Sequence, residues 1–133
     1  MTHTVDAQGR ATRIPGPDHP ITLECNPNRV VVSAAGRIIA DTREALTLRE
    51  ARYPAVLYIA RADVDTSLLE RTSQVTYCPY KGECLYYSIP LGGSRAVNAA
   101  WSYEEPYPAV AAIRGHLAFY ADRVESIEEL PVP

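Results

Sequence analysis

The chain has 133 residues, a length that fits one domain with a hydrophobic core of its own. Hydrophobic residues make up 47% and charged residues 22%, as in ordinary globular proteins, and no apolar run approaches the roughly 18 residues that a membrane span needs. The net charge of −3 and the scattered basic residues disfavour nucleic acid as a partner, because phosphate-backbone binding relies on clustered Lys and Arg.

Lysine is almost absent from the sequence. Twelve of the 13 basic residues are Arg, and Lys81 is the single Lys. Together with abundant Ala, this bias indicates a GC-rich, bacterial genome. Because Lys and Arg differ in hydration, in shape and in the ease of losing a proton, the one Lys that remains is a candidate functional residue.

The three cysteines, Cys25, Cys78 and Cys84, are odd in number and include no C-x-x-C pair. This pattern disfavours both a secreted disulfide framework and a structural zinc site, so we expect no metal and no cofactor. Residues 1–6 show neither the basic opening nor the apolar core of an export signal, and we therefore expect a cytoplasmic protein.

Polarity and turn residues divide the chain into three parts. Residues 1–19 are polar and rich in Pro and Gly, which predicts a flexible N-terminal arm. Residues 20–127 are predicted to form a single β-rich domain, and residues 128–133 a frayed tail.

The first predicted strands follow the arm. Residues 29–33 and 37–41 are β-branched runs on either side of a short Gly-containing loop at 34–36, which predicts a hairpin. Residues 45–50 alternate apolar and polar as a half-buried strand does, and residues 56–59 predict another strand.

A second hairpin dominates the middle of the chain. After a helical turn near 65–69, residues 73–77 and 83–89 predict two strands around a Pro- and Gly-containing turn at 78–82. Residues 95–102 predict a further strand.

The last third of the domain holds the one predicted helix, near residues 108–114. Pro108 suits a first helical position, and Gly115 suits a C-terminal stop. Residues 117–120 and 123–127 predict a final hairpin. Many short strands separated by frequent turns predict a mainly β fold of several short, coiled antiparallel sheets.

Four segments together resemble the domain of unknown function 427 family. These are residues 76–83 (TYCPYKGE) and 98–103 (NAAWSY), with 39–42 before them and 118–124 after them. The resemblance extends over about residues 20–127. It implies a β-tent architecture, similar to methionine sulfoxide reductase B and to several zinc-binding modules.

The resemblance implies little about activity. The family has been labelled nucleotidyltransferase-like, but the sequence has neither a Gly-Ser followed by paired metal-binding carboxylates nor a Gly-rich phosphate loop. The Cys pairs on which the redox and zinc-binding relatives of the fold depend are also absent, so their chemistry does not carry over.

The central hairpin concentrates reactive side chains. With Tyr80 and Lys81 at the tip, Cys78 is expected to oppose Glu83, and Tyr77 to face the other side of the hairpin. A one-residue bulge would reverse this division on one strand. In either register, a thiol and a carboxylate lie near a mobile ammonium group.

Four residues are candidate catalytic groups: Lys81, Glu83, Cys78 and Glu50. Glu83 or Glu50 could act as a base and Lys81 as an electrostatic stabiliser. For Cys78, a buried structural role is favoured over a nucleophilic one, because Glu83 would oppose the stabilisation of a thiolate by Lys81. The alternatives without a functional role are a plain salt bridge between Lys81 and Glu83, and a solvated strand end at Glu50.

Aromatic residues provide the candidate ligand-binding groups Tyr58, Tyr77, Tyr80 and Trp101. Six of the nine tyrosines and the only Trp lie within residues 77–107. Their rings and hydroxyls could line a pocket, or the hydroxyls could simply join the coiled sheets.

Two classes of function remain open. The first is a small-molecule-binding protein or a small metal-independent enzyme that uses the hairpin residues. The alternative is a non-enzymatic module for protein interaction or self-association, which would make a homo-oligomer. Nucleotidyl transfer is less favoured. Neither nucleic acid nor a membrane is expected as a partner.

Overall fold

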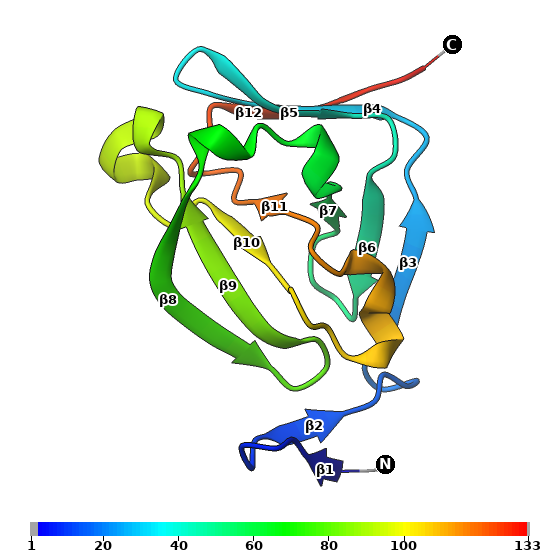
Figure 1. The fold of residues 1–133 in the computed structure, drawn as a ribbon. Helices are drawn as coiled ribbons and strands as arrows, with labels where there is room; N and C mark the ends of the chain where they lie inside the picture. The colour runs from blue at the N-terminus through cyan, green and yellow to red at the C-terminus, as the bar shows by residue number, and fades with distance from the viewer. Residues whose placement is uncertain (1–2, 133) are drawn as a thin grey trace.

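Short antiparallel strands dominate the computed structural model, which describes residues 3–132 (Figure 1). The strands are β1 (His3–Val5), β2 (Ala11–Arg13), β3 (Ile21–Cys25), β4 (Arg29–Ala34), β5 (Arg37–Thr42), β6 (Leu46–Glu50), β7 (Val56–Tyr58), β8 (Glu70–Cys78), β9 (Gly82–Ser88), β10 (Ala100–Ser102), β11 (Ala118–Phe119) and β12 (Ser126–Leu130). They form four small sheets, in the orders β1–β2, β11–β10–β9–β8, β12–β4–β5 and β3–β6–β7. The mainly β prediction is therefore confirmed.

The helical segments of the described residues are short and of 3₁₀ type. They are η1 (Arg61–Asp63), η2 (Thr66–Leu68), η3 (Pro90–Ala96) and η4 (Pro108–Ile113). In η2, the helical turn expected near residues 65–69, the Asp65 side chain accepts a hydrogen bond from the Ser67 N–H. η4 begins at Pro108 as predicted but is kinked at Val110. Within residues 3–132, no helix has the length and apolarity that crossing a bilayer would require.

The β4–β5 hairpin is formed as the sequence predicts. Its two turn residues, Ala35 and Gly36, both have positive φ angles, of 51° and 74°. Two positive φ angles give the turn a twist that matches that of the flanking strands. A register shift between Val32 and Ser33 bends the pair further.

The predicted final hairpin is wrong. Residues 117–120 and 123–127 do not pair with each other, because β11 pairs with β10 and β12 pairs with β4. Leu117 is fully buried and exchanges main-chain hydrogen bonds with Ile59. A buried apolar segment must be packed on both sides, and here β10 and the segment at Ile59, rather than residues 123–127, pair with residues 117–119.

Three further segments differ from the sequence predictions. The strand expected at 95–102 is shortened to β10, because residues 95 and 96 belong to η3 and Asn98 has a φ of 53°. β3 was not predicted and pairs with β6. Part of the expected frayed tail, residues 128–130, continues β12 along β4.

The N-terminal region forms the β1–β2 hairpin, at the opposite end of the molecule from the β12–β4–β5 sheet (Figure 1). The Arg13 N–H donates to the Pro79 carbonyl oxygen at 2.9 Å, which joins the region predicted as an arm to the tip of the β8–β9 hairpin. Residues 1–2 of that arm and residue 133 of the tail lie outside the described residues.

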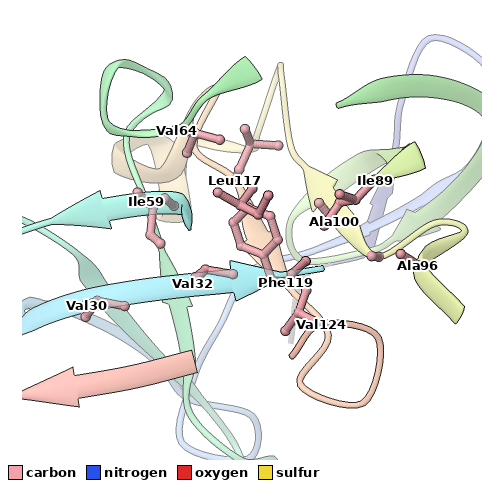
Figure 2. Packing of buried hydrophobic residues seen from close by; sticks show 14 of the residues in the cluster. Val30, Val32, Ile59, Val64, Ile89, Ala96, Ala100, Leu117, Phe119 and Val124 are labelled. Carbon is pink, nitrogen blue, oxygen red and sulfur yellow. The ribbon is translucent and has the colours of Figure 1, made fainter. Parts of the chain in front are cut away.

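Two hydrophobic clusters hold the sheets together. The larger one packs aliphatic side chains of β4 against Leu117 and Phe119, as Figure 2 shows. The second cluster lies between the β3–β6–β7 sheet and β9–β10, and phenols make up much of it. Its buried members are Leu48, Tyr58, Cys84, Tyr86, Tyr103, Val110, Ile113 and Ala118. Buried phenol hydroxyl groups need hydrogen-bond partners inside the core. This second cluster also borders the candidate site.

Candidate functional site

The β8–β9 hairpin has a register one residue away from the expected one. Cys78 pairs with Gly82, and Tyr77 rather than Cys78 opposes Glu83. The loop therefore has three residues, Pro79 to Lys81. Gly82 makes this loop possible because its φ of 108° is a conformation that side chains other than hydrogen rarely allow.

The corrected register changes which side chains share a face. Glu83 shares a face with Tyr77, while Cys78 lies on the opposite face with Cys84. The Glu83 side chain is 51% exposed and bonds to Arg10 at 3.2 Å. The salt bridge between Glu83 and Lys81, considered as an alternative to ligand binding, does not form, and Glu83 instead makes a surface ion pair with Arg10 of the N-terminal region.

Lys81 points inward from the hairpin loop. The residue is only 8% exposed, and its Nζ pairs with Oε1 of Glu50, the last residue of β6. Oε2 of Glu50 lies 2.7 Å from Nε2 of His19, just before β3. The His19 ring stacks on Tyr80, with ring centroids 4.0 Å apart and planes 4° apart. The hairpin loop, β6 and the segment before β3 thus meet at one carboxylate.

The charge of Glu50 is stabilised by its two partners. Burial alone would raise the pKa of its carboxyl group, but the hydrogen bonds from Lys81 and His19 outweigh burial and lower it. The ammonium group of Lys81 also lies 5.9 Å from the centre of the Tyr103 ring, within the range of a cation–π contact. The site therefore holds an ionised pair away from bulk water.

A cavity of about 190 Å³ opens beside this ion pair. We call it the tyrosine pocket. It is lined by Glu50, Lys81 and Cys84 and by the rings of Tyr58, Tyr86, Tyr103, Tyr120 and Trp101. The rings come from β7, β9, β10 and the segments that follow β10 and β11.

The phenols of the pocket are neutral hydrogen-bonding groups. Burial raises the pKa of Tyr58, Tyr86 and Tyr103 above the ordinary value, so their hydroxyl groups keep their protons. Trp101 Nε1 donates to Tyr58 Oη at 3.2 Å. Since the Tyr58 hydroxyl accepts from Trp101, its own proton is free to be donated to another group.

A comparison with protein families matches a model described as a domain of unknown function, DUF427 (NTP_transf_9), over residues 22–130. The chain belongs to this family. The resemblance inferred from the four motifs is thus confirmed, and the matched region runs from β3 to the end of β12. No curated protein matches the chain.

The matched DUF427 region contains every residue that lines the tyrosine pocket, but not all of the site. Glu50 and Lys81 lie within residues 22–130, whereas His19 and the β1–β2 hairpin precede them. Among residues 3–132, no three His, Cys, Asp or Glu side chains are grouped so that they could hold a metal ion.

The structure brings four of the predicted residues together in the pocket, namely Lys81, Glu50, Tyr58 and Trp101. The other four lie around it or outside it. Cys78 is half-buried at the border of the phenol cluster, and Tyr80 covers His19. Tyr77 and Glu83 are on the other face of the hairpin, where Tyr77 Oη bonds to Tyr107 Oη at 2.7 Å.

Four pocket residues, Cys84, Tyr86, Tyr103 and Tyr120, were not predicted from the sequence, and neither was His19, the second partner of Glu50. Cys84 and Tyr86 carry a signal in their alternation along β9, which places both on the inner face of the hairpin. Burial raises the pKa of the Cys84 thiol, which disfavours the thiolate that a nucleophile needs.

Proposed function

We propose that the protein binds a small molecule with a carboxylate or carbonyl group in the tyrosine pocket, close to Lys81. The observation that carries this proposal is the inward-facing ammonium group. Both oxygens of Glu50 are engaged, by Lys81 and by His19, whereas Lys81 Nζ donates to Glu50 alone among the described residues. An ammonium group has three N–H donors, so two remain for a ligand.

The rest of the pocket is also rich in donors. Neutral phenol groups at Tyr58 and Tyr103 face the same cavity as Lys81. A ligand that supplies acceptor oxygens would satisfy these groups, and aromatic walls would cover its carbon atoms. A carboxylate fits best, because hydrogen bonds between charged partners are the stronger ones.

The protonation states favour binding over proton transfer. A carboxyl group whose pKa is lowered, as that of Glu50 is, makes a weak base at neutral pH. Phenols with raised pKa values make weak acids. Lys81 is therefore proposed as a binding and charge-stabilising group, and neither Glu83 nor Cys78 has a position that supports a catalytic role.

Burial of the tyrosines favours a ligand pocket over a self-association surface. Tyr58, Tyr86 and Tyr103 are buried, so they do not make the flat exposed patch that association through tyrosines would need. The three free cysteines, Cys25, Cys78 and Cys84, support a cytoplasmic location as part of the proposal, since an oxidising compartment favours paired thiols.

A titration followed by calorimetry tests the proposal. Propanoate is the probe, and propan-1-ol is the matched probe without charge. We expect propanoate to bind more tightly than the alcohol, and Lys81→Met to weaken propanoate binding by about tenfold or more. Glu83→Gln should leave the affinity within about twofold, because the Glu83 side chain lies on the other face.

Tyr103→Phe removes one hydrogen-bond donor but keeps the ring. It provides a second test of the site in case Lys81→Met does not fold. We expect it to weaken propanoate binding by about three- to tenfold. Circular dichroism of each variant shows whether it is folded. Unchanged propanoate affinity in the folded Lys81→Met and Tyr103→Phe proteins would refute the proposed site.

A further inference from the structure

A second cavity, of about 550 Å³, lies on the other face of the β3–β6–β7 sheet. Side-chain alternation along β6 and β7 separates the two cavities. Leu48, Glu50 and Tyr58 line the tyrosine pocket, whereas the intervening residues Thr47, Arg49 and Leu57 line the second cavity. We call the second cavity the rear cavity.

The two cavities adjoin each other near the first residue of β7. They share four lining residues: Pro54, Val56, Trp101 and Tyr120. β7 is an edge strand of its sheet, and on its free side the chain is bonded to Leu117 only through Ile59. Beside Val56, the first residue of β7, Trp101 and Tyr120 line both cavities.

The aromatic pair at this junction faces both sides. The rings of Trp101 and Tyr120 are in contact, with centroids 4.4 Å apart and planes 42° apart. Trp101 is also bonded to Tyr58 inside the tyrosine pocket. A ligand that passes around the end of β7 would thus contact Trp101 over most of its path.

The floor of the rear cavity is apolar. Val32, Ile59 and Phe119 are buried side chains that line it. Some of the polar groups at its rim are paired, since Asn26 Nδ2 donates to Thr47 and to Glu129 at 3.1 Å and Arg49 Nε donates to Glu24 at 3.1 Å. The floor of the rear cavity therefore offers apolar surface, unlike the tyrosine pocket with its phenol and ammonium groups.

We infer that the ligand is an amphipathic carboxylate, whose head binds Lys81 and whose apolar tail passes Trp101 into the rear cavity. This inference rests on the proposed function for the head. The tyrosine pocket alone, at about 190 Å³, is smaller than the ~300 Å³ at which ordinary ligand sites begin, whereas the two cavities together fall within their range.

A chain-length series tests the inference, with straight-chain carboxylates from acetate to octanoate as probes. Trp101 is the only Trp, and it lines both cavities, so its fluorescence reports binding. We expect affinity to rise about two- to fourfold per added methylene beyond propanoate and then to level off when the rear cavity is filled.

Two variants distinguish binding of the apolar tail from binding of the carboxylate head. Leu57→Asn places an amide in the rear cavity and should flatten the dependence on chain length while leaving propanoate affinity within about twofold. Leu91→Asn is the matched control, since Leu91 is exposed and lines neither cavity, and it should keep the full dependence.

Other results of these titrations would refute either the tail site or the proposed head site. If propanoate binds but octanoate binds no more tightly, the tail site is refuted and the proposed head site stands. If Leu57→Asn keeps the full dependence on length, the tail lies elsewhere and the inference fails. If no carboxylate binds at all, the proposed function itself fails and the inference falls with it.

Discussion

Replacing Lys81 by Met should destabilise the protein in a way that depends on Glu50. Met keeps most of the side-chain volume but leaves the carboxylate without its closest cation. The two side chains are 11% and 12% exposed, so the pair is largely buried. Removing one partner of a fully buried pair costs about 3–5 kcal/mol. Because His19 still bonds to Glu50, we expect a loss of about 2–3 kcal/mol at neutral pH.

The stability that Lys81→Met removes should be smaller at acidic pH than at neutral pH. In the native protein the folded-state pKa of Glu50 is lowered, so its contribution to stability is present above its unfolded pKa of about 4.3 and disappears as pH falls through the folded value. In Lys81→Met, burial is opposed by His19 alone, and the folded pKa rises. Protonation of Glu50 then relieves the unpaired charge. We expect a penalty about 1 kcal/mol smaller near pH 4 than near pH 7.

Urea unfolding of four proteins measures this coupling: the native protein, Lys81→Met, Glu50→Gln and the double variant. Trp101 fluorescence and circular dichroism follow the transition at about pH 7 and about pH 4. The double variant should lose at least about 1 kcal/mol less than the sum of the single losses. Losses that add within about 0.5 kcal/mol would refute the buried pair, as would a penalty independent of pH.

Three further predictions concern the hairpin and the thiols. Gly82→Ala should lower the free energy of unfolding by about 1–3 kcal/mol, since φ is 108° and the added Cβ would lie 3.3 Å from a main-chain carbonyl oxygen; an unchanged urea midpoint would contradict the loop geometry. Glu83→Gln should cost no more than about 0.5 kcal/mol, because its pair with Arg10 is exposed; the same urea assay measures it. In a reaction with Ellman's reagent, Cys25 should react at once and Cys84 only on unfolding, because one is exposed and the other is buried with a raised pKa; fast reaction of Cys84 in the native protein would contradict its burial.

Local signals predicted the parts of the fold that depend on neighbours in sequence. The β4–β5 hairpin follows from two β-branched runs around Gly36, and η4 begins at Pro108 as the sequence indicates. Local patterns leave the register of β8–β9 open, because a turn of two or three residues satisfies the same sequence. The observed three-residue loop places Cys78, rather than Tyr77, on the same face as Cys84.

Contacts between segments that are distant in the sequence could not be predicted from local sequence patterns. Glu50 and Lys81 are 31 residues apart, and their meeting depends on how two sheets pack. β12 pairs with β4, which lies far from it in the chain, and β11 pairs with β10 across η4 rather than with β12. His19 was missed because its Pro- and Gly-rich surroundings predict an arm rather than a partner for a carboxylate.

The most direct test of the central claim uses the fact that Lys81 is the only lysine. Labelling the protein with ¹³C,¹⁵N-lysine gives one side-chain ammonium signal in an NMR spectrum, and it belongs to the group proposed to hold the ligand. Titration with propanoate should shift this signal in step with the saturation of binding measured by calorimetry. A signal that stays in place while propanoate binds to saturation would contradict the assignment of the ligand to the tyrosine pocket.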